Sequence, residues 1–292
     1  MAEIIGAIAT SHVPAIGKAI AQGLQDEPYW KPFFQGFDYV RSWLGKERPD
    51  VVVFFYNDHG LNFFLDKMPT FAVGAAAEYP NADEGWGLPV SRAFQGDPAF
   101  SWHVIETLIK DEFDIVTCQQ MLVDHAVAIP MQLFWPGAQT SGAQTWPVKI
   151  IPVSINTVQH PLPSAARCFK LGRSVGRAIE SYDKNLRVAV VGTGGLSHQL
   201  DGKRAGFINK EFDLLCLDKI VNEPEALTRY SNEQLVELAG TQGVELLNWI
   251  AMRGALTGDV SQLYRNYHIP ISNTAAATIV LDHRKNLQRK AA

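Results

Sequence analysis

The sequence has few cysteines, no excess of basic charge and no long apolar run. Its three cysteines, Cys118, Cys168 and Cys216, lie too far apart for the CxxC spacing of zinc or redox sites. A formal net charge of −4 excludes the basic footprint of a nucleic-acid-binding protein. No apolar run reaches the roughly 18 residues of a membrane span, and the amino terminus lacks the pattern of a signal peptide. We therefore expect a reduced, cytoplasmic protein that binds neither nucleic acid nor membrane.

The composition is that of a globular protein, with 47% hydrophobic and 19% charged residues. A length of 292 residues fits one α/β domain with a core that needs no disulfides. We expect that domain over residues 1–283. The basic stretch within residues 284–292 predicts a flexible tail.

Continuous apolar, β-branched runs predict strands that are buried on both faces. These strands are predicted at 4–9, 51–56, 70–73, 148–153, 188–191 and 276–281. Amphipathic patterns predict helices at 37–44, 98–110, 165–181, 209–222, 232–239 and 244–253. The alternation predicts an α/β fold, a single layered domain in which helices flank a central, mostly buried sheet.

Three histidines follow directly after predicted strands. His12, His59 and His198 lie just beyond the first, second and fifth of these strands, and His125 follows a weaker apolar run. In an open α/β sheet, such strand ends meet in one crevice. Because neutral imidazole is the commonest side-chain ligand for transition metals, the pattern predicts a metal site there. The pattern leaves open which of these histidines bind the metal.

A carboxylate would complete such a site. Two imidazoles and one carboxylate form the ligand set of non-haem Fe(II) oxygenases, and the same ligands suit zinc. Glu211, Glu237 and Glu245 all lie in helical patterns. Glu245 has the most apolar neighbours, and a desolvated carboxylate requires a compensating cation. The physics favours Glu245 without excluding the other two.

The glycine-rich segment 192–195 does not match a nucleotide-binding motif. No Gly-Lys-Ser/Thr follows it, and the GxGxxG spacing is missing. Ser197 also lacks the Gly-x-Ser-x-Gly context of a hydrolase nucleophile. We interpret these glycines as a place where the backbone approaches a substrate or a metal closely.

At these residues the chain resembles the class III extradiol dioxygenases of the LigB type, and among them the catalytic β subunits of protocatechuate 4,5-dioxygenases. The resemblance runs from about residue 4 to residue 281 in one order. The matching segments are 10–15 (Thr-Ser-His-Val-Pro-Ala), 56–59 (Tyr-Asn-Asp-His), 82–87, 123–125 (Val-Asp-His), 192–199, 204–211, 243–245 (Gly-Val-Glu), 252–256 and 272–274 (Ser-Asn-Thr).

The resemblance assigns roles to five of the residues considered above. It implies that His12, His59 and Glu245 bind Fe(II) and that His198 acts as the acid–base catalyst. It places His125 near the substrate and dioxygen. A zinc hydrolase and a non-catalytic interaction module are the rival hypotheses. The intact set of His12, His59, His198 and Glu245 argues against the module.

The resemblance also implies a substrate and partners. Ser272 and Asn273 match the segment that holds the ring carboxylate, and together with Val13 they favour protocatechuate. The expected product is 4-carboxy-2-hydroxymuconate-6-semialdehyde, within aromatic catabolism such as lignin degradation. Gallate and 3-O-methylgallate stay as alternative substrates. A small α subunit that caps the site, or a homodimer, is the expected assembly.

Overall fold

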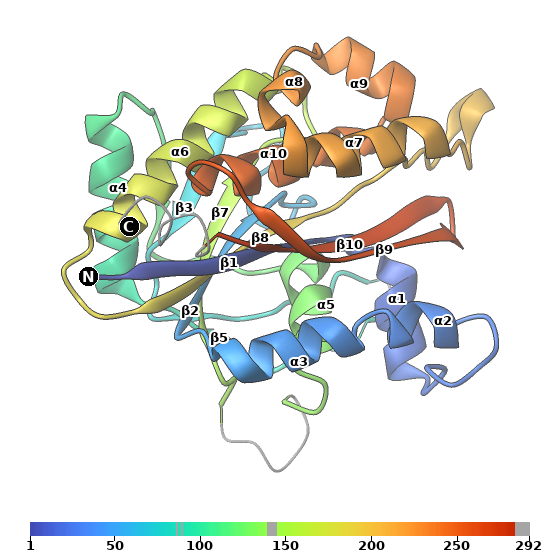
Figure 1. The fold of residues 1–292 in the computed structure, drawn as a ribbon, viewed down its shortest axis with the longest axis horizontal. Coiled ribbons are helices and arrows are strands. Elements are labelled where there is room, and N and C mark those ends of the chain that lie inside the picture. The colour runs from blue at the N-terminus through green and yellow to red at the C-terminus, as the bar shows by residue number, and fades with distance from the viewer. Residues whose placement is uncertain (86, 89, 139–144, 284–292) are drawn as a thin grey trace.

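The computed structural model describes residues 1–85, 87–88, 90–138 and 145–283. At its centre lies an eight-stranded sheet with the order β6-β3-β7-β2-β8-β1-β10-β9 (Figure 1). These strands are β1 (Glu3–Thr10), β2 (Val51–Tyr56), β3 (Phe71–Gly74), β6 (Val116–Cys118), β7 (Lys149–Ile155), β8 (Arg187–Thr193), β9 (Ser261–Ile271) and β10 (Thr274–Asp282). A separate short pair is formed by β4 (Glu78–Tyr79) and β5 (Phe94–Gln95).

The sheet is mixed, and its direction explains where the histidines meet. Strands β7, β2, β8 and β1 run parallel to one another, whereas β10 is antiparallel to β1 and β9 is antiparallel to β10. The carboxyl ends of β1, β2 and β8 therefore lie side by side at one edge. The segments that carry His12, His59 and His198 leave the sheet at that edge.

Helices cover both faces of the sheet, as Figure 1 shows. One face carries α4, α6, α7 and α10, and the other carries α1, α3 and α5. The helices are α1 (Pro14–Ala21), α2 (Lys31–Gln35), α3 (Asp38–Glu47), α4 (Pro98–Lys110), α5 (His125–Phe134), α6 (Ala165–Ser181), α7 (Lys210–Asn222), α8 (Pro224–Leu227), α9 (Asn232–Ala239) and α10 (Leu246–Ala255). The predicted layered α/β architecture and all six predicted strands are confirmed.

One predicted boundary is wrong at a residue that matters. The helix expected over 244–253 begins at Leu246, because Gly243–Glu245 forms a single 3-10 turn before it. Glu245 therefore stands at the start of α10 instead of on the side of a regular helix. This position brings it close to the carboxyl ends of the parallel strands.

Other sequence predictions lie outside what the structure tests. In the described part of the chain, no helix combines the length and apolar character needed to cross a bilayer. The predicted tail, residues 284–292, lies outside the described residues. The domain boundaries and the cytoplasmic location stay predictions.

Candidate metal centre

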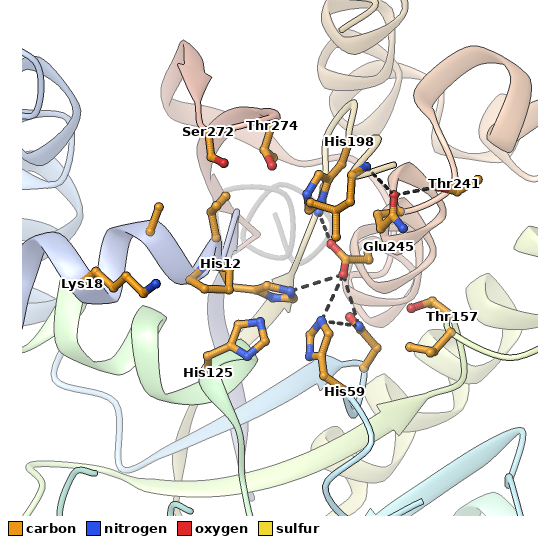
Figure 2. A pocket seen from close by; sticks show the side chains of 18 residues that line it. His12, Lys18, His59, His125, Thr157, His198, Thr241, Glu245, Ser272 and Thr274 are labelled. Atoms are coloured by element: carbon orange, nitrogen blue, oxygen red, sulfur yellow. Dashed lines mark hydrogen bonds and ion pairs between the residues drawn. The ribbon is translucent and has the colours of Figure 1, made fainter. Parts of the chain in front are cut away.

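A cavity of about 510 Å³ opens at the carboxyl ends of β1, β2 and β8 (Figure 2). Its wall contains seven of the eight site residues predicted from the sequence, and Asn273 is the one that does not line it. These seven are His12, Val13, His59, His125, His198, Glu245 and Ser272. Asn57, Lys18 and Thr274 also line the cavity.

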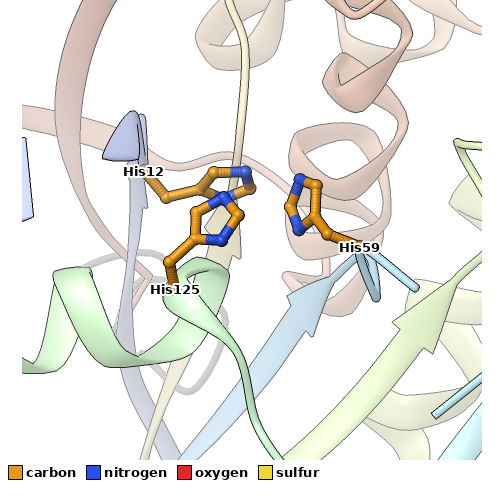
Figure 3. Close-up of side chains that lie close together, drawn as sticks. All are labelled: His12, His59 and His125. Atoms are coloured by element: carbon orange, nitrogen blue, oxygen red, sulfur yellow. The ribbon is translucent and has the colours of Figure 1, made fainter. Parts of the chain in front are cut away.

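Three imidazole rings that line this cavity lie close together (Figure 3). The ring centroids of His12 lie 5.2 Å from those of His59 and 5.3 Å from those of His125. One nitrogen from each of the three rings lies within 4.8 Å of the others. The expected crevice of imidazoles is therefore present, and its geometry allows a shared metal ion.

Glu245 reaches the same point from the opposite side. Its Oε1 atom lies 3.4 Å from Nε2 of His12 and 3.4 Å from Nε2 of His59. The side chain is buried, whereas Glu211 and Glu237 are exposed and do not line the cavity. Among the three acids weighed from the sequence, Glu245 is the one that meets the histidines.

The polar atoms of His12 supply a direct test of whether a metal fits. Both ring nitrogens are buried and accept or donate no hydrogen bond to any described residue. Leaving a buried polar group without a partner costs about 1–3 kcal/mol. A cation coordinated by Nε2 and by the neighbouring Oε1 of Glu245 would remove that cost at Nε2. The donor set therefore fits a divalent transition metal.

His59 is held by two carboxylates from different elements. Asp124 accepts hydrogen bonds from the backbone N–H of His59 (2.8 Å) and from its ring Nδ1 (3.0 Å). Asp58 accepts backbone N–H groups of residues 60–63 and so folds the turn that carries His59. Burial lowers the pKa of His59, but Asp124 and Glu245 outweigh it and raise the pKa to about 10. A carboxylate that accepts a hydrogen bond from Nδ1 leaves Nε2 to face a metal ion, as is usual for metal-binding histidines.

Glu245 has partners on both of its oxygens. Gly195 donates its backbone N–H to Oε2 (2.8 Å), and Asn57 donates Nδ2 to Oε1 (3.2 Å). Asn248 in turn donates its Nδ2 to Oδ1 of Asn57 (3.0 Å) and holds that amide in place. Burial alone would raise the pKa of Glu245, but His12 and His59 lower it well below its usual value. The carboxylate is therefore ionised and orientated.

The segment before His198 passes unusually close to Glu245. A Cβ atom at Gly194 would lie 2.6 Å from Cβ of Glu245, and the φ angle of Gly194 is +108°. A glycine is required there for both reasons. The close approach is to a candidate ligand side chain.

His198 and His125 also form part of the cavity wall. The backbone N–H of His198 donates to the carbonyl of Ala239 (2.7 Å), and the preceding Ser197 Oγ donates to Asp213 (2.7 Å). Burial lowers the pKa of His198, so its ring is neutral near neutral pH. His125 begins α5 and is 2.8 Å from Glu84 through Nδ1.

Several residues that shape the site were missed from the sequence. Asp124, Asn57 and Asn248 act on the ligand side chains, and Glu84 acts on His125. Asp124 had a local signal, since an Asp before a helix start is a typical N-cap and its side chain accepts the N–H of Ala126. Glu84 lies in the matching segment 82–87 but was given no role there. Asn248 had no local signal, because its partners lie far away in the sequence.

The fold and this site agree with a known family. Residues 6–278 match the family described as the catalytic LigB subunit of aromatic ring-opening dioxygenase. This match covers most of the chain. The chain belongs to that family, which is the resemblance inferred from its motifs.

Two dioxygenases are among the proteins to which this chain is similar. A gallate dioxygenase from Pseudomonas putida is 39% identical over 203 residues, which cover 70% of this chain and 58% of that protein. A 2,3-dihydroxyphenylpropionate/2,3-dihydroxicinnamic acid 1,2-dioxygenase from Rhodococcus jostii is 30% identical, over 76% of this chain and 80% of that protein. The chain thus spans little more than half of the gallate enzyme's length.

A solved structure shares the fold at low sequence similarity. An uncharacterized protein from Escherichia coli K12 aligns with a TM-score of 0.57 and 15% identity. The alignment covers 94% of this chain and 99% of the other. At this identity the likeness shows the common architecture alone.

Proposed function

We propose that this chain is a non-haem Fe(II) extradiol dioxygenase that opens the ring of a catecholic aromatic acid with O2. His12, His59 and Glu245 would hold the iron. The observation that carries the proposal is the buried His12 ring. Its nitrogens have no hydrogen bond to the part of the chain that the structure describes, and it faces an ionised carboxylate 3.4 Å away. Protocatechuate is the expected substrate, and 4-carboxy-2-hydroxymuconate-6-semialdehyde is the expected product.

The ligand side chains favour a metal with open positions. Because the N–H of Gly195 engages Oε2 of Glu245, Oε1 is the oxygen directed at both histidines. Two imidazoles and one such carboxylate leave adjacent positions for a diol and for dioxygen. Ferrous iron bound there would supply the Lewis acidity and the one-electron chemistry that a reaction with O2 requires.

His198 is suited to move the proton. Its lowered pKa keeps the imidazole neutral, and it lines the cavity beside the ligand group. A neutral imidazole can take the proton of a ring hydroxyl as the diol binds and return it when the ring opens. His125 lies with its ring against His59 and His12, held by Glu84, and would contact substrate or dioxygen.

Gallate is the second candidate substrate. The 39% identity to a gallate dioxygenase supports it, and 3-O-methylgallate stays as a further alternative. Ser272 and Val13 line the cavity and could contact the ring substituents of any of these acids. Asn273 is half-buried next to Ser272, and its role stays a prediction.

Oxygen consumption tests the proposal. The protein should be loaded anaerobically with Fe(II) and then given protocatechuate, gallate, 3-O-methylgallate and catechol in separate electrode runs. We expect stoichiometric O2 uptake and a yellow semialdehyde-type product with at least one acid. A protein that holds zinc in place of iron and consumes no O2 with any of them would support the hydrolase hypothesis instead.

The assembly is a separate question. The resemblance predicts a small α subunit over the site or a homodimer, and both stay predictions. Full turnover by the isolated chain would count against an obligatory α subunit.

A further inference from the structure

We propose that Lys18, together with the start of α1 and the hydroxyl of Thr274, forms an anion subsite for the carboxylate of the aromatic substrate. This inference rests on the proposed function, because it assigns the residue that selects carboxylated rings over neutral ones. It adds a charged residue to a cavity whose predicted substrate contacts, Val13, Ser272 and Asn273, are uncharged.

Helix α1 forms one wall of the cavity. Pro14, Ala15 and Lys18 all line it, a spacing that places them on one helical face. Figure 2 shows the Lys18 side chain extending from α1 toward His12 and His125. The cation is thus directed toward two of the histidines that line the cavity.

The charges around the cavity single out Lys18. Among the described residues that line it, Lys18 is the one lysine or arginine and Glu245 is the one carboxylate. Glu245 is already engaged by Gly195, Asn57 and the two histidines, whereas Lys18 forms no ion pair with any described residue. An incoming carboxylate would therefore find its opposite charge at Lys18.

Two uncharged features of the same cavity also favour an anion. Thr274 is 1% exposed, lines the cavity, and its Oγ1 has no hydrogen-bond partner among the described residues. Helix α1 begins at the cavity with no side-chain cap on its first turn. A helix amino terminus favours negative charge, and a buried hydroxyl without a partner favours a ligand that accepts a hydrogen bond from it.

The consequence is selectivity between substrates. Gallate and protocatechuate carry a carboxylate on the ring, whereas pyrogallol and catechol present the same hydroxyl groups without it. A charge-assisted hydrogen bond to Lys18 would be worth about ten- to a hundredfold in binding. Because Lys18 is exposed, added salt should weaken that preference.

The test replaces the charge while keeping most of the side chain. Lys18→Met removes the cation, Lys18→Arg retains it, and Lys110→Met removes an exposed lysine of α4 as a matched control. The Fe(II)-loaded proteins are compared by kcat/KM for gallate over pyrogallol and for protocatechuate over catechol. We expect both ratios to fall about tenfold or more in Lys18→Met and to persist in the other two variants.

A binding measurement separates this inference from the proposed function. Calorimetric titration of each metal-free protein with benzoate reports the subsite without turnover and without a metal ion that the carboxylate could bind. We expect benzoate binding to weaken at least tenfold in Lys18→Met and to be restored in Lys18→Arg. Thr274→Val should weaken it by a smaller factor.

The outcomes are distinct. If wild-type protein oxidises gallate and Lys18→Met keeps the same substrate ratios, the subsite is wrong and the proposed function stands. If no diol consumes O2 but benzoate binding depends on Lys18, ring cleavage is wrong and the subsite stands. Equal benzoate binding by the wild type and Lys18→Met would overturn the subsite.

Discussion

The two ends of strands β1, β2 and β8 differ in whether their polar groups have partners within the protein. At the amino ends, Arg187 binds Glu3 Oε1 (2.8 Å) and Glu47 Oε2 (2.9 Å), and its backbone N–H donates to Asp50 (2.8 Å). At the carboxyl ends, His12 is buried with neither ring nitrogen hydrogen-bonded to a described residue. The first set is internally paired, and the second is arranged for something that binds.

The difference shows how stability and function divide along one sheet. A buried carboxylate such as Glu47 is tolerated because a guanidinium compensates it inside the fold. Glu245 is equally buried, but its partners are two imidazoles that converge on one oxygen. Groups that are costly within the fold and converge on one point are candidates for ligand binding.

Removing Glu245 should have the largest effect. The Glu245→Ala protein is expected to lose more than about a hundredfold in iron affinity, since even outer-sphere partners of metal ligands are worth about 10–100-fold. Iron content after anaerobic loading and desalting measures this. The matched control is Glu237→Ala, an exposed glutamate that should leave iron content unchanged. Full iron content and full activity in Glu245→Ala would show that Glu245 is not a metal ligand.

Replacing His198 should reduce turnover and spare the metal. We expect His198→Gln to bind iron normally and to lose about 10²–10⁴ in kcat, the usual contribution of a general acid–base group. His103→Gln is the control, because His103 bonds to Ala178 and Ser181 on α6, away from the cavity. Loss of iron in His198→Gln would mean that this ring is a ligand and not the proton carrier.

The pH profile should sharpen the role of His198. Its pKa is lowered from 6.5 by burial, so the neutral, proton-accepting form persists below that pH. We expect kcat/KM to be flat near neutral pH and to fall about tenfold per pH unit only below the lowered pKa. Iron content measured at each pH must stay constant for this interpretation. An acid limb centred above pH 7 would contradict it.

At the opposite end, the expected effect is on stability alone. Arg187→Met leaves the buried Glu47 carboxylate without its guanidinium, which should lower the free energy of unfolding by about 1–3 kcal/mol. Chemical denaturation measures this change, and kcat should be unchanged. Arg173→Met, which breaks an exposed pair with Glu225, should cost about 0–1 kcal/mol. A large fall in kcat for Arg187→Met would show that the two ends are coupled.

The sequence predicted six of the strands well because their apolar runs are continuous and their burial is nearly complete. It missed β9, where Arg265, Asn266 and His268 interrupt the apolar pattern at an edge of the sheet. It missed α5, because Pro130 lies inside that helix. In both cases tertiary packing stabilises an element that the local sequence pattern disfavours.

The site was predicted in part by physics and in part by resemblance. The strand-end positions of His12, His59 and His198 and the apolar neighbours of Glu245 were sufficient to bring those residues together. Their division into ligands and proton carrier came from the family pattern alone. Lys18 could not be found, since an exposed lysine on a short helix carries no signal until the cavity beside it is known.

The 3-10 turn that ends at Glu245 also bears on how the protein matures. His12 follows β1 and Glu245 precedes α10, so the two side chains cannot meet until the chain between them has folded. Any ion that binds there will therefore lower the free energy of the complete fold and of no fragment. Loss of the ion should therefore lower the melting temperature of the whole molecule.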